Sequence, residues 1–89
     1  MIRADRELDC RGLSCPLPVI YTRRALALMS SGETLMVVTT DPESVADIAE
    51  LSRRNRTELV TQREDGGDYI FFLRKGPDYA DCRDDRPKA

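Results

Sequence analysis

The stretch Cys15-Pro16-Leu17-Pro18 marks the point where a predicted strand gives way to a predicted helix. Pro16 suits the first position of a helix, because its φ is already helical and its missing N–H would have no partner there. Cys15 is then expected to be the N-cap. At that position the positive end of the helix dipole favours the thiolate, which is the reactive form of cysteine.

The neighbours of Cys15 also favour a reactive thiol. Pro18, at the third helical position, has no N–H to give to the sulfur, so Leu17 is left as the one nearby capping donor. Gly12 allows a sharp turn after the strand, and Ser14 is small enough to leave the sulfur accessible. The alternative is a buried packing residue, as free cysteines often are, but the two flanking prolines favour a functional role.

Composition limits the possible functions. The 89 residues suffice for one domain with a modest core, and the net charge of −2 argues against a nucleic-acid binder. No apolar run resembles a signal peptide or could span a membrane, so we expect a cytoplasmic protein without a membrane partner. The chain contains no histidine, which excludes a Cys-His catalytic pair and every His-containing metal site. We expect neither a metal nor a bound cofactor.

The remaining two of the three cysteines have different expected roles. In a reducing compartment all three should be thiols. Cys10 alternates with Leu8 and should face inward with it as a small core residue. The rival role is a resolving thiol that forms a disulfide with Cys15, which requires Cα atoms within about 7 Å. Cys82 should be an ordinary exposed thiol in the tail.

Hydrophobic periodicity predicts six elements in the order strand, helix, strand, helix, strand, strand. Their expected bounds are 4–10, 16–29, 33–40, 42–54, 58–64 and 69–75. A strand-helix-strand unit should be parallel, whereas the Asp65-Gly66-Gly67-Asp68 turn should close an antiparallel hairpin. The predicted fold is a two-layer α/β sandwich, in which both helices cover one face of a mixed four-stranded sheet. Residues 1–76 form the predicted domain, and residues 77–89 a disordered tail.

The two helices are expected to begin differently. Asp41 should be an ordinary N-cap of the second helix, and Pro42 its first residue.

The first helix should pack one stripe of residues on the sheet and turn its other side outward. That outer side carries aliphatic residues and arginines near Cys15, and we expect it to be a docking patch for a partner protein: Leu17, Ile20, Arg23 and Arg24. The alternative is a solvated face with stray apolar groups.

Residues 8–19, Leu-Asp-Cys-Arg-Gly-Leu-Ser-Cys-Pro-Leu-Pro-Val, resemble the opening signature of the TusA/SirA-like sulfur carrier family. That signature places an aspartate, a glycine and a Cys-Pro-x-Pro motif in this order. The resemblance continues at Gly32-Glu33, Asp41-Pro42 and Phe72-Leu73-Arg74-Lys75, and covers about residues 7 to 76.

The resemblance implies a small carrier rather than a stand-alone enzyme. Cys15 would accept sulfane sulfur as a persulfide from a cysteine desulfurase or a rhodanese-type donor and pass it to an acceptor protein. The receiving route would be tRNA thiolation, cofactor synthesis or sulfur oxidation, with no cofactor beyond the covalent sulfur. The expected site comprises Cys15 with Pro16, Pro18, Gly12, Asp9 and Arg11. Within it Asp9 would fix the turn and Arg11 would add positive potential, unless both are plain surface charges.

Two other classes of function remain open from the sequence. In a redox or regulatory module, Cys10 and Cys15 would form a reversible disulfide, which requires Cys10 to lie near the surface. In a purely structural binding module, Cys15→Ser would leave function intact.

Overall fold

The computed structural model describes residues 3–79. Its elements follow the predicted order: β1 (Arg6–Cys10), α1 (Leu17–Ala27), β2 (Thr34–Thr39), α2 (Ser44–Arg54), β3 (Thr57–Asp65) and β4 (Asp68–Lys75). Neither helix in this part of the chain is long and apolar enough to cross a membrane.

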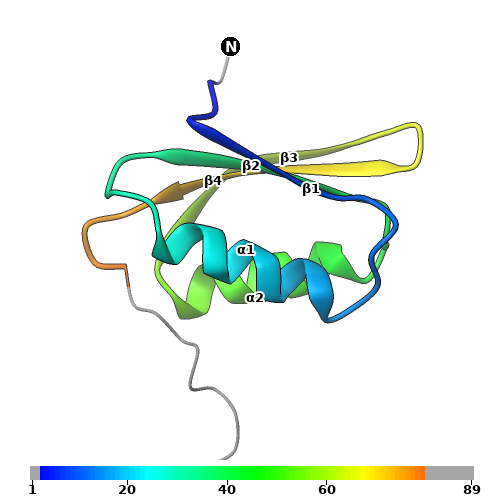
Figure 1. The fold of residues 1–89 in the computed structure, drawn as a ribbon, viewed down its shortest axis with the longest axis horizontal. Helices are drawn as coiled ribbons and strands as arrows, with labels where there is room; N and C mark the ends of the chain where they lie inside the picture. The colour runs from blue at the N-terminus through cyan, green and yellow to red at the C-terminus, as the bar shows by residue number, and fades with distance from the viewer. Residues whose placement is uncertain (1–2, 80–89) are drawn as a thin grey trace, which may run out of the picture.

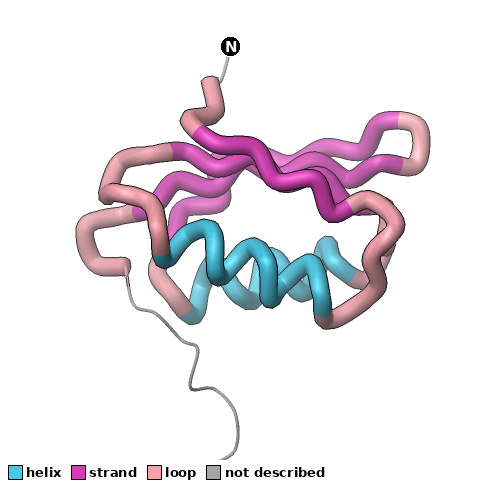
Figure 2. Tube along the Cα trace, in the orientation of Figure 1, coloured by secondary structure: helices cyan, strands magenta, loops and turns pink. Residues whose placement is uncertain are grey.

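The four strands form one mixed sheet in the order β1-β2-β4-β3. β1 and β2 are parallel, and β4 is antiparallel to both of its neighbours. Figure 1 shows α1 and α2 side by side on one face of this sheet, and Figure 2 shows the same two layers as helix and strand. The predicted two-layer α/β sandwich is confirmed.

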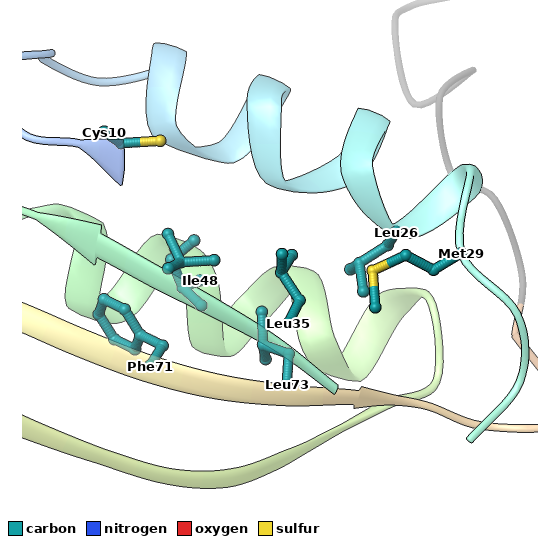
Figure 3. Close-up of a cluster of buried hydrophobic side chains, with 8 residues drawn as sticks. Cys10, Leu26, Met29, Leu35, Ile48, Phe71 and Leu73 are labelled. Atoms are coloured by element: carbon teal, nitrogen blue, oxygen red, sulfur yellow. The ribbon is translucent and has the colours of Figure 1, made fainter. Parts of the chain in front are cut away.

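The core fills the space between the two layers. Alternate residues of each strand face the helices, which is why Leu35 and Val37 of β2 lie beside Leu73 and Phe71 of β4. Figure 3 shows this cluster. Its buried members are Cys10, Leu26, Met29, Leu35, Val37, Ile48, Phe71 and Leu73.

The β3–β4 hairpin closes at the predicted turn. Gly66 and Gly67 have φ values of 61° and 95°, which belong to the left-handed region that glycine adopts at little cost. Asp65 pairs with Asp68 across this turn. The two-residue turn therefore sets the register of the hairpin.

The helices begin later than predicted. Pro16 has φ −101° and ψ 16° and is the N-cap of α1, so the helix starts at Leu17. The N-cap of α2 is Glu43 rather than Asp41. The chain first makes a turn in which the Asp41 carbonyl accepts from the Ser44 N–H at 2.9 Å and from the Ser44 hydroxyl at 2.6 Å.

The packed part of the chain extends beyond the boundary predicted at residue 76. Tyr79 is half-buried against the core cluster, and the Lys75 ammonium lies over its ring at 4.4 Å from the centroid. Cys82 and the rest of the predicted tail lie outside the described residues.

Both helices begin at the same end of the sheet. This follows from the parallel pairing of β1 and β2, because each helix starts just after the carboxyl end of one of these strands, and Figure 1 shows both starts at that edge. Loops at this edge are where open α/β sheets usually bind their ligands. Cys15 lies in the first of these loops.

Candidate functional site around Cys15

The loop that carries Cys15 is tied to the loop before α2. The Cys15 backbone N–H donates to Asp41 Oδ2 at 2.8 Å, and the Gly12 N–H donates to Thr40 Oγ1 at 2.9 Å. Gly12 has a φ of 82°, so the predicted sharp turn requires the conformational freedom of glycine here. These two hydrogen bonds join the loop after β1 to the loop after β2, and so they fix the position of the Cys15 backbone.

The Cys15 side chain contacts α2. Cys15 is exposed, and its Sγ donates a hydrogen bond to Asp47 Oδ2 at 3.1 Å. That hydrogen bond is the largest influence that raises the thiol pKa. Partial desolvation and the negative charges of Asp47, Glu43 and Asp41 raise it further.

The expectation of a dipole-stabilised thiolate is therefore wrong for the isolated chain. Cys15 precedes the N-cap instead of occupying it, and α1 has no side-chain capping bond. The expected capping donor is also engaged elsewhere, because the Leu17 N–H donates to the Ser14 carbonyl at 2.9 Å. The carboxylates near Cys15 raise the pKa of its thiol, so they favour the neutral thiol over the thiolate.

A shallow groove of about 220 Å³ opens between the two helices beside Cys15. Its apolar part includes Val19 of α1 and Leu51 of α2, and its charged part belongs to α2. The full lining is Cys15, Pro16, Val19, Asp47, Glu50, Leu51 and Arg54. The groove beside Cys15 therefore offers a carboxylate from α2 and apolar side chains from both helices.

The two prolines of the motif have different environments. Pro16 is exposed and lines the groove, whereas Pro18, in the first turn of α1, is fully buried. Pro18 thus anchors the helix start in the core, and Pro16 sets the path of the chain directly after the cysteine.

Asp9 and Arg11 form a hydrogen-bonded ion pair with each other. Arg11 donates from Nε and from a terminal guanidinium nitrogen to the two Asp9 oxygens, each at 2.9 Å, and from its backbone N–H at 3.1 Å. These hydrogen bonds lower the pKa of Asp9 from 3.8 to about 2. Asp9 therefore has the turn-fixing contacts expected of it. Arg11 is engaged with Asp9, while the charges acting on the Cys15 sulfur are carboxylates.

Cys10 is a core residue. Its exposed fraction is 0%, it lies in the cluster of Figure 3, and burial raises the pKa of its thiol, with a smaller contribution from Asp9. The inward orientation predicted for Cys10 is confirmed. The reversible-disulfide hypothesis required Cys10 near the surface and has no support in this structure.

The predicted docking residues lie on the outer side of α1. Leu17 and Arg24 are exposed, and Ile20 and Arg23 are half-buried. The Arg24 guanidinium lies 5.9 Å from the ring centroid of Tyr21, which is exposed as well. All four residues lie on α1, the helix that follows Cys15, and their role in docking stays a prediction.

Two residues of this site were not predicted from the sequence as site residues. Asp47 is not singled out by any sequence pattern, and Asp41 is expected to be an ordinary helix cap. A signal did exist, because two helices that follow parallel strands begin at the same sheet edge, so acidic residues early in α2 should lie near the start of α1. Among residues 3–79, no group of three or more metal-ligating side chains is gathered.

Comparison with known proteins agrees with this architecture. The family model "Sulfurtransferase TusA" matches residues 6–75. A sulfur carrier protein TusA from Allochromatium vinosum is 42% identical over 71 residues, which cover 80% of this chain and 93% of that protein. The crystal structure of a SirA-like protein from Desulfitobacterium hafniense shares the fold, with a TM-score of 0.71 at 23% identity over 80% of this chain and 97% of that one. The match to the family model and the 42% identical relative show that this chain belongs to the TusA family.

Proposed function

We propose that this chain is a sulfur carrier that holds a sulfane sulfur as a persulfide on Cys15 and relays it from a donor protein to an acceptor protein. The relay function predicted from the opening motif agrees with membership of the TusA family. The observation that supports Cys15 as the carrying residue is its place in the site: an exposed free thiol at the mouth of the interhelical groove, on a loop held by Asp41.

The proposed transfer is an exchange of the thiol–disulfide type. The Cys15 sulfur attacks the outer sulfur of the donor persulfide, a new S–S bond forms to Cys15, and the S–S bond of the donor breaks. The donor sulfur leaves as a thiolate and takes up the proton that Cys15 has lost. Delivery repeats the exchange with Cys15 as the leaving group, so no external oxidant or reductant is consumed.

The finer identity of the partners is part of this proposal. A cysteine desulfurase or a rhodanese-type protein is the donor, and the acceptor serves tRNA thiolation, cofactor synthesis or sulfur oxidation. The chain itself requires no bound cofactor, since the carried atom is covalent. We place the relay in the cytoplasm, where reducing conditions keep thiols free.

Intact-protein mass spectrometry tests the proposal. The wild type, Cys15→Ser, Cys10→Ser and Cys82→Ser are incubated with a cysteine desulfurase, pyridoxal phosphate and cysteine, and in parallel with a rhodanese and thiosulfate. A mass gain of one sulfur atom that disappears only in Cys15→Ser supports the carrier. The proposal fails if no sulfur is gained from either donor, or if Cys15→Ser gains sulfur as the wild type does. Loss of two hydrogens through Cys10 and Cys15 would instead favour the redox module.

A further inference from the structure

The unloaded Cys15 sulfur, although exposed, donates a hydrogen bond to a side chain of α2. Its partner, Asp47, is half-buried in the first turn of α2, and the Asp47 backbone N–H donates to the Glu43 carbonyl at 3.3 Å. The carboxylate is thus held on a helix, and the 3.1 Å contact joins two elements that are otherwise separate in the chain. Nothing in the relay chemistry described above uses Asp47.

The contact discriminates between protonation states of sulfur. A carboxylate accepts a hydrogen bond from S–H, but it repels a sulfur anion, which has no proton to donate. Glu43 and Asp41 add charge of the same sign near Cys15. The groove also contains Glu50 and one basic residue, Arg54. The acidic groups that act on the sulfur therefore favour its neutral form.

Loading changes both the length and the charge of the Cys15 side chain. A hydropersulfide is one sulfur atom longer than the thiol and is a stronger acid, so its terminal sulfur is anionic at neutral pH. We infer that Asp47 is a positioning residue for sulfur transfer: its carboxylate holds the unloaded thiol against α2 and turns the loaded, anionic persulfide outward toward the acceptor. This inference rests on the proposed function of Cys15.

The first arm of the test uses the unloaded protein and requires no donor. Alkylation of Cys15 by iodoacetamide, a neutral reagent, is followed from pH 6 to 10 on the Cys15 peptide by mass spectrometry, so that Cys10 and Cys82 do not contribute. In Asp47→Asn the rate at pH 7 should rise about three- to tenfold, and the pH profile should shift to lower pH, because a change of one pKa unit is a tenfold change in thiolate. Glu50→Gln removes the same charge from the groove without the contact and should change the rate less than about twofold.

The second arm uses the protein loaded with sulfur by a desulfurase and follows alkylation of the terminal persulfide sulfur. In Asp47→Asn this rate should fall about two- to fivefold, because without the negative charge of residue 47 the anionic persulfide is no longer turned outward. Asp47→Glu retains the charge with a displaced carboxylate and should fall between the wild type and Asp47→Asn in the first arm. Circular dichroism verifies that each variant is folded.

The outcomes separate the inference from the proposed function. An Asp47→Asn thiol rate within twofold of the wild type or of Glu50→Gln overturns the role of Asp47 in holding the thiol. An unchanged or faster persulfide rate in Asp47→Asn overturns its role in turning the persulfide outward. If neither the wild type nor any variant gains sulfur, the proposed function is overturned instead. The part of the inference that concerns the persulfide then falls with it. The first arm still decides whether Asp47 holds the thiol.

Discussion

The backbone N–H of Cys15 donates to Oδ2 of Asp41 at 2.8 Å, although the two residues lie 26 positions apart. Oδ1 of the same carboxylate accepts from the Glu43 N–H at 3.1 Å. One side chain thus joins the loop before α1 to the loop before α2. The loop that contains Cys15 is thus held in place by Asp41, a residue that resembles a simple helix cap in the sequence.

Asp41→Ala should therefore destabilise the fold. Two hydrogen bonds to a charged acceptor are lost, and their backbone donors must find water, which costs about 1–2 kcal/mol in the free energy of unfolding. Urea denaturation measures this cost. Asp41→Asn keeps one acceptor oxygen and should lose less than half as much. Equal stability of Asp41→Ala and the wild type would show that the loops do not depend on this side chain.

The fold could be predicted because its signals are local. Alternation indicates that Leu8 and Cys10 face inward, and the Gly66-Gly67 pair indicates the hairpin, so the elements and the hairpin pairing follow from short stretches of sequence. The position of β4 between β2 and β3 depends on contacts across the sheet and was not predicted. The boundaries of α1 and α2 were off by one to two residues at their starts, because a proline or aspartate there is compatible with both a turn and a first helical turn.

The electrostatics of the site could not be predicted in the same way. The residues next to Cys15 in the chain, taken alone, predict a thiolate at the start of the helix. The groups that raise the pKa of this thiol, above all Asp47, come from α2 and the turn before it, far from Cys15 in the sequence, and their effect depends on contacts between side chains. Residues 9–18 indicate which cysteine to propose as the carrying residue, but they do not indicate that acidic side chains surround it.

The burial of Cys10 leads to a prediction on thiol reactivity. Burial raises the pKa of the Cys10 thiol and shields its sulfur, so native protein at pH 8 should be alkylated at Cys15 and not at Cys10. Cys10 labelling should require unfolding and follow the urea transition. Peptide mass spectrometry after timed labelling measures both sites. Labelling of Cys10 at a rate near that of Cys15 in native protein would revive the dithiol hypothesis.

The Asp9–Arg11 pair predicts a pH dependence of stability. The folded pKa of Asp9 is about 2, below its ordinary 3.8, so the pair stabilises the fold above about pH 4, and this contribution is lost as the pH falls through 2. In Arg11→Gln the Asp9 pKa should return toward 3.8 in an NMR titration of its carboxyl carbon. Arg24→Gln, which lies on the outer side of α1, should leave it at about 2. An unchanged Asp9 pKa in Arg11→Gln would show that the backbone N–H alone holds the carboxylate.

The outer side of α1 gives the last prediction, on partner docking. Leu17, Ile20, Arg23 and Arg24 lie on the N-terminal part of α1, the helix that begins just after Cys15, so we expect a donor protein that reaches the sulfur to contact this surface. Arg24→Glu should slow sulfur loading by a desulfurase about tenfold at low salt, because charge complementarity acts mainly on association rates, and should leave persulfidation by inorganic polysulfide unchanged. Arg63→Glu makes the same charge change on β3 and serves as the control. If both variants slow loading equally, net charge explains the effect; if neither does, donors dock elsewhere.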